Sequence, residues 1–80
     1  MSGRDLLGGP DFDAWPGGEN VPLDEQIAEV EREIRMRRNV YAAWIRKGTM
    51  SDEKAEKQLG AMLAVRRSLV RLRETKAAMR

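Results

Sequence analysis

Two long segments of helical apolar periodicity, joined by only four residues, constrain this 80-residue chain more than any other feature. Apolar side chains recur every three or four positions through residues 22–47 and again through residues 52–79. That spacing places them on one face of an α-helix. The connection from Gly48 to Ser51 is short, and short connections make consecutive helices antiparallel neighbours. We therefore predict an all-α fold, an antiparallel two-helix hairpin over residues 22–80.

Start and stop signals bound both predicted helices. Pro22 suits a first turn, where its missing N–H has no partner within the helix. Gly48 is a good residue to end the first helix, and Ser51 is a good N-cap for the second. Gly60 lies inside the second helix, where glycine is less favourable than alanine by roughly 1 kcal/mol. We expect close packing against this position to explain why a glycine stands there.

The predicted apolar faces are wider than one neighbouring helix can cover. The first segment presents Leu23, Ile27, Val30, Ile34, Tyr41, Trp44 and Ile45, interrupted where Arg37 takes a position on the same face. The second presents Ala55, Leu59, Met62, Leu63, Val65, Leu69, Val70 and Leu72, about half of its circumference. A smaller apolar group, Met36, Val40 and Ala43, lies on the flank of Trp44. We expect this surplus surface to be covered by the N-terminal arm, by a second copy in a dimeric four-helix bundle, or by another protein.

The order of charges supports the antiparallel pairing. Residues 24–33 carry five acids and one arginine, whereas residues 66–80 carry six basic residues and one acid. In the hairpin, facing residues are those whose numbers add to about 99. This places Arg71, Arg73 and Lys76 beside the acidic start of the first helix. Arg66 can then pair with Glu29, Glu31 or Glu33, or its long stem can extend to the edge of the interface.

Residues 1–21 form a separate Gly/Pro-rich arm. Paired glycines and three prolines, counting Pro22, disfavour regular structure in this part of the chain. Phe12 and Trp15 nevertheless lie among acidic residues, and a solvated linker rarely contains such aromatics. We interpret the segment as an extended arm that docks on its own helices or on a partner, with disorder as the third interpretation.

A second candidate feature is a belt of arginines at one level of the hairpin: Arg35, Arg37, Arg38, Arg66 and Arg67. The belt is either a solvated face of ion pairs or a patch that binds phosphates or an acidic protein. Zinc-finger spacing and an RNA-binding aromatic motif are both absent, so the sequence supports nucleic-acid binding only weakly.

The residue types for catalysis are largely missing. The chain has no cysteine and no histidine, which removes the thiol nucleophile, the commonest general base and the commonest metal ligands. Neither a nucleophile motif nor a phosphate-binding loop is present. We predict no enzymatic activity, no cofactor, no metal and no membrane span, and an intracellular location.

Residues 27–65 also carry a family resemblance. An acidic helix leads into Arg35 to Arg38, followed by Val40–Tyr41, Trp44, Gly48 to Met50 and a second helix. This series resembles a group of short proteins encoded in bacteriophages and prophages of proteobacteria. The resemblance implies a helical hairpin that originates from a mobile element and is located in the cytoplasm of a bacterial host.

Three functional hypotheses follow. The first is a non-enzymatic phage accessory protein that binds and blocks a host protein complex, with anti-CRISPR inhibition as the nearest analogy. The second is a nucleic-acid binder that uses the arginine belt, and the third is a structural phage component. The predicted partner-binding residues are Phe12, Trp15, Met36, Val40, Trp44, Arg35, Arg38, Arg66 and Arg67.

Overall fold

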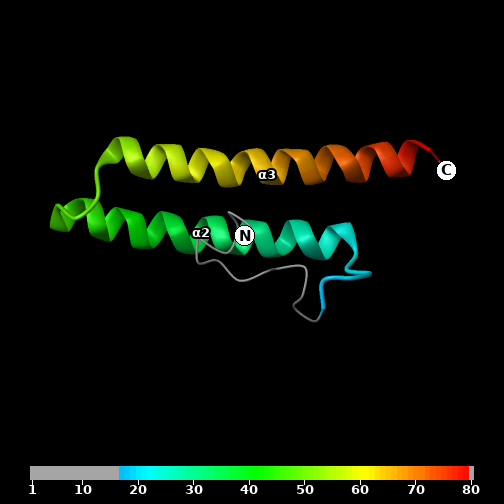
Figure 1. The fold of residues 1–80 in the computed structure, drawn as a ribbon, viewed down its shortest axis with the longest axis horizontal. Helices are drawn as coiled ribbons and strands as arrows, with labels where there is room; N and C mark the ends of the chain where they lie inside the picture. Colours follow the sequence, from blue (N-terminus) through cyan, green and yellow to red (C-terminus); the bar gives the residue numbers. More distant parts are fainter. Residues whose placement is uncertain (1–16, 80) are drawn as a thin grey trace, which may run out of the picture.

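The chain folds as two helices that lie side by side and run in opposite directions (Figure 1). The computed structural model describes residues 17–79, and within that range it contains helices and no strands. Helix α2 spans Leu23–Lys47 and helix α3 spans Asp52–Ala78. The predicted helical hairpin is confirmed, and each helix boundary falls within one residue of its predicted position.

The four-residue turn between the helices is formed by local hydrogen bonds. Gly48 has a φ of 79°, a left-handed conformation that favours glycine. Its N–H donates to the carbonyl of Ile45, and the N–H of Thr49 donates to that of Trp44, which together make a Schellman motif. The hydroxyl of Ser51 then accepts a hydrogen bond from the N–H of Lys54 and caps α3. These bonds reverse the chain within four residues.

The core between the helices is thin. Only four hydrophobic residues in the described range are buried: Ile27, Ile34, Tyr41 and Ala55. No large side chain of residues 17–79 is less than 2% exposed. Two helices offer each other one stripe apiece, so most apolar side chains at the edges of that stripe stay half-exposed.

Cross-helix polar contacts define the register. Arg66 Nε donates to Glu31 Oε2 at 2.7 Å, and Tyr41 Oη donates to Gln58 Oε1 at 2.9 Å. The predicted pairing of Arg66 with a glutamate of the first helix is therefore confirmed, and Glu31 is the partner. The side chains of Arg66 and Glu31 are 43% and 35% exposed, so the pair lies at the edge of the interface.

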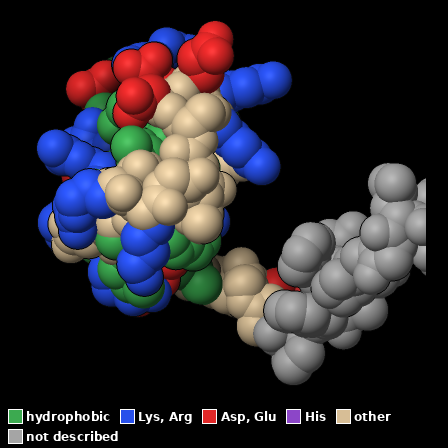
Figure 2. Space-filling view, turned by 90° about the vertical axis from the view of Figure 1, so that its left-hand side faces the viewer, with side chains coloured by type: hydrophobic (Ala, Val, Ile, Leu, Met, Phe, Trp, Pro, Cys, Tyr) green, Lys and Arg blue, Asp and Glu red, His purple; other side chains and the backbone are tan. Residues whose placement is uncertain are grey.

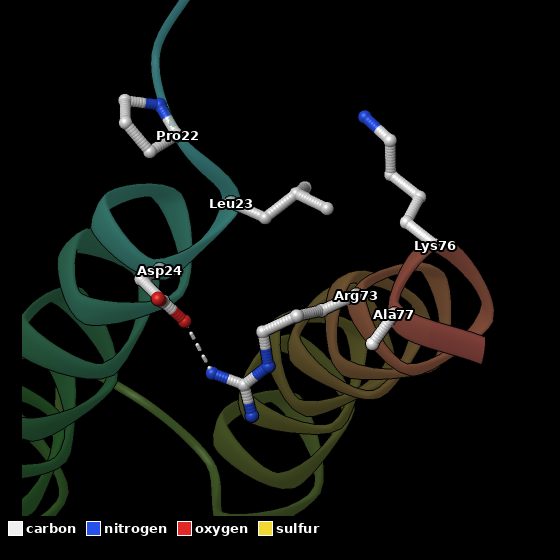
Figure 3. A pocket seen from close by; sticks show the side chains of 6 residues that line it. All are labelled: Pro22, Leu23, Asp24, Arg73, Lys76 and Ala77. Atoms are coloured by element: carbon white, nitrogen blue, oxygen red, sulfur yellow. Dashed lines mark hydrogen bonds and ion pairs between the residues drawn. The ribbon is translucent and has the colours of Figure 1, made fainter. Parts of the chain in front are cut away.

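The open end of the hairpin has a matching ion pair (Figure 3). Arg73 Nη1 lies 2.7 Å from Asp24 Oδ1, as the predicted antiparallel register requires. Figure 3 shows Leu23 pointing toward the space between the helices, while Lys76 points away from the ion pair. A shallow pocket at this end is lined by Pro22, Leu23, Asp24, Arg73, Lys76 and Ala77. It lies where the packing between the two helices ends.

Two details of the predicted packing are wrong. A Cβ added to Gly60 would have no neighbouring atom within 4 Å, so close packing does not explain this glycine. Trp44 was predicted on the face toward the second helix, yet it is 45% exposed. Its neighbour Ile45 is the half-buried residue at this end of α2, because one helical position rotates a side chain by about 100°.

Candidate interaction surface

Three large apolar side chains form an exposed stripe along α2. Met36, Val40 and Trp44 are 48%, 40% and 45% exposed, and each lies four positions after the one before. Residues at that spacing project from the same side of a helix. The stripe lines one shallow depression together with Glu33, Arg37 and Tyr41. We call Met36, Val40 and Trp44 the α2 stripe.

Trp44 packs against the buried ring of Tyr41. Its ring centroid lies 5.8 Å from that of Tyr41, and the two rings are tilted by 30°. Tyr41 is only 7% exposed, and its hydroxyl is hydrogen-bonded to Gln58 of α3. The exposed indole of Trp44 therefore lies against a buried, hydrogen-bonded aromatic ring.

Ion pairs within α2 neutralise the charges beside the stripe. Arg37 Nε lies 3.0 Å from Glu33 Oε1, and this hydrogen bond raises the pKa of Arg37 above its ordinary value. Arg32 pairs with Glu29, and this hydrogen bond lowers the pKa of the Glu29 carboxyl. Arg32 Nη1 also lies 3.1 Å from the sulfur of Met36. The immediate border of the stripe is therefore polar but close to neutral.

The predicted arginine belt is only partly free. Arg37 and Arg66 are paired with Glu33 and Glu31, whereas Arg35 and Arg38 make no ion pair within residues 17–79. Arg35 and Arg38 line one shallow depression with Asn39 and Ala42. Arg67 is exposed on α3 and also has no ion pair among the described residues.

Acidic and basic side chains occupy different parts of the linker end of the hairpin. Figure 2 looks at this end and shows acidic side chains gathered at the top, over α3, with Lys and Arg on both flanks. Apolar side chains are visible between the basic groups in the same view. The surface therefore offers basic and apolar groups side by side, an arrangement suited to protein recognition.

Two predicted partner-binding residues, Phe12 and Trp15, lie outside the described residues. Of the others, Met36, Val40 and Trp44 lie together, and Arg35 and Arg38 lie together. One set of exposed residues was predicted to be part of the interhelical face: Leu63, Val65 and Leu72, which are 45–47% exposed. The predicted apolar arc on α3 was wider than one neighbouring helix can cover, and this width indicated that some of its residues would stay exposed.

The described part of the chain offers no metal site and no membrane span. No group of three or more His, Cys, Asp or Glu side chains in that part is arranged to hold a metal ion. Neither α2 nor α3 has an apolar stretch long enough to cross a bilayer.

No protein-family model, no characterised protein and no solved structure matches this chain. The resemblance to phage-encoded hairpin proteins accordingly stays a prediction.

Proposed function

We propose that this chain is a non-enzymatic binding protein, whose α2 stripe docks into an apolar groove of a partner protein and blocks it. The observation that carries the proposal is the exposure of Met36, Val40 and Trp44 along one side of a single helix. Helices that bind in grooves use anchors three, four or seven residues apart on one face. Tryptophan is also among the residues that contribute most to binding energy at protein interfaces.

The charges near the stripe indicate the chemistry of the partner. Glu29 and Glu33 are occupied by Arg32 and Arg37, so the α2 stripe has little free negative charge beside it. Arg35 and Arg38 line a separate depression on another side of α2 and do not border the stripe. An apolar groove with a polar, uncharged rim would complement the stripe and its paired border.

A bacterial host protein complex is the first partner to test. The resemblance of residues 27–65 to phage and prophage proteins supports this choice, and anti-CRISPR inhibition is the nearest analogy. Fold-level analogy alone does not assign function, so the test must be direct binding.

The experiment is a binding measurement between the full chain and purified host complexes, including CRISPR effectors. Met36→Asp places a charge in the stripe, and we expect at least about a tenfold loss of affinity because an interface anchor contributes more than 1 kcal/mol. Asn39→Asp is the matched control, since it adds the same charge at an exposed position of α2 outside the stripe. Equal loss for both variants would contradict the role of the stripe. Trp15→Ala tests the arm separately.

The exposed arginines support a second candidate, nucleic-acid binding. Arg35 and Arg38 line a common depression, and two adjacent guanidinium groups are a plausible phosphate contact. A gel-shift titration at low salt should then show binding that weakens steeply as salt rises and that Arg38→Glu with Arg67→Glu abolishes. A flat titration removes this candidate. The third hypothesis, a structural component assembled as a helical bundle, depends on self-association.

A further inference from the structure

An uncharged seam runs along the flank of α3, beside the side that packs on α2. Five residues follow one another at spacings of three and four, the repeat of a coiled-coil contact line. They are Gln58, Ala61, Val65, Ser68 and Leu72. All are exposed except the half-buried Gln58, and Val65 and Leu72 are 45% and 47% exposed. We call this series the outer seam.

The outer seam carries no charged residue, whereas the face of α3 that packs on α2 carries two arginines. The α2-facing side of α3 includes Arg66 and Arg73, which bind Glu31 and Asp24. By contrast, no charged residue interrupts the outer seam over four helical turns. A solvent-facing helix surface is normally polar, so an uncharged line with exposed Val65 and Leu72 suggests a helical partner.

The start of the outer seam contains a preformed hole for a side chain. Lys54, Lys57, Gln58 and Ala61 line one shallow depression, with Ser51 and Glu53 at its border. The first four are at positions i, i+3, i+4 and i+7, the set that surrounds a knob in coiled-coil packing. The hydrogen bond from Tyr41 fixes Gln58 within it. Leu72, the large exposed residue at the other end of the seam, can serve as the knob that enters such a hole.

We propose that a second copy of this chain covers the outer seam, with the two α3 helices antiparallel and Val65 at the two-fold axis. Val65 is the midpoint of Asp52–Ala78, and Gln58 and Leu72 lie equally far on either side of it. The two-fold rotation therefore places Leu72 of each copy over the hole beside Gln58 of the other. A two-fold interface requires such a self-complementary patch.

The remaining residues of the seam fit this register. Ala61 lies within one residue of the level of Ser68 of the second copy, and two small side chains allow the helices to approach closely. Lys54, four residues before Gln58, meets Lys76 of the second copy at each end of the contact. These like charges limit the overlap, so screening by salt should strengthen the dimer, opposite to its effect on phosphate binding.

Sedimentation equilibrium of the full chain tests the assembly. We expect the mass to double with rising concentration, and Leu72→Glu to keep the protein monomeric with unchanged helical circular dichroism. Leu63→Glu is the matched control, because Leu63 is an equally exposed leucine of α3 outside the seam. A wild-type chain that stays monomeric up to about 1 mM overturns the proposal. Equal effects of the two glutamate variants overturn it as well.

Two further variants test the register. The chain has no cysteine, so Val65→Cys introduces a single thiol, which should form an intermolecular disulfide under mild oxidation. Leu63→Cys should not, and equal cross-linking by both would contradict a two-fold axis at Val65. Lys54→Glu turns both end repulsions into attractions and should tighten the dimer by about two- to tenfold. Weaker association of Lys54→Glu would exclude this register.

The two proposed surfaces depend on different exposed residues, and the Tyr41–Gln58 hydrogen bond lies between them. Met36→Asp should abolish partner binding and leave the dimer intact, while Leu72→Glu should do the reverse. The two proposals can therefore fail separately.

Discussion

The hydroxyl of Tyr41 donates a 2.9 Å hydrogen bond to the amide oxygen of Gln58, and this bond connects both surfaces of the hairpin. The Tyr41 ring supports Trp44 in the α2 stripe. Gln58 belongs to the outer seam and lines the hole at its start. One cross-helix contact thus orders side chains on two different faces.

Removing this bond should weaken the hairpin modestly. Tyr41→Phe keeps the buried ring and deletes the hydroxyl, so we expect the free energy of unfolding to fall by about 0.5–1 kcal/mol. Gln58 is half-exposed and can bind water instead, which limits the loss. Chemical denaturation measures the change, with Tyr41→Ala as the larger perturbation. A variant as stable as the wild type would show that the bond contributes nothing.

The thin core makes Ile34 far more important for stability than the similarly sized Met36. Ile34 is 8% exposed, so Ile34→Ala should cost about 2–4 kcal/mol and unfold much of the hairpin. Met36 is 48% exposed, so Met36→Ala should change stability by less than about 0.5 kcal/mol. Thermal melts followed by circular dichroism compare the two. Similar melting temperatures would contradict the assignment of core and surface.

Gly60 is a position at which the hairpin can be stabilised. It lies inside α3, and a Cβ there would meet open space. Gly60→Ala reduces the entropy of the unfolded chain without a clash, so we expect a gain of about 0.5–1 kcal/mol. Urea denaturation measures it. A loss of stability would instead indicate that another molecule packs against Gly60 in solution.

The two cross-helix ion pairs should differ in strength. The side chains of Glu31 and Arg66 are 35% and 43% exposed, whereas Asp24 of the second pair is 79% exposed. Since solvent screens exposed charges, a double-mutant cycle on Arg66→Met and Glu31→Gln should give about 0.5–1 kcal/mol. The same cycle on Arg73 and Asp24 should give less than about 0.5 kcal/mol. The reverse order would contradict this ranking.

The Glu29–Arg32 pair makes a prediction about pH. The hydrogen bond from Arg32 lowers the pKa of Glu29 below its ordinary value of 4.5. A lowered folded-state pKa gives a contribution to stability that is present above the unfolded value and is lost as pH falls through the folded value. Carboxyl chemical shifts from an NMR titration should show the low pKa, and Arg32→Met should raise it. An unchanged pKa in that variant would rule out the pairing in solution.

Much of the fold could be predicted from local patterns. Ser51 and Gly48 bound the turn because their preferred hydrogen bonds and backbone conformation suit helix ends. The charge order predicted that Arg73 lies beside the acidic start of the first helix, where it pairs with Asp24, because a hairpin with a short turn has only a narrow choice of register. These features depend on residues close in sequence, or on one simple geometric relationship.

The exposed surfaces could not be assigned in the same way. Helical periodicity groups apolar residues on a wide arc, but it does not say which part of that arc faces the neighbouring helix. Trp44 and Val65 both belong to predicted apolar faces, and both are 45% exposed. Gly60 is a similar case, since its surroundings depend on which way α3 is rotated.

The sequence by itself determined two helices, their ends and their antiparallel order, because capping, spacing and charge act over a few residues or along one axis. Only the tertiary structure decided that Ile34 and Tyr41 fill the core while Val65 and Leu72, which the same periodicity placed on an apolar face, stay exposed. The physical reason is rotation about the helix axes. Each helix can turn by a fraction of a residue at little local cost, and packing between α2 and α3 selects one rotation.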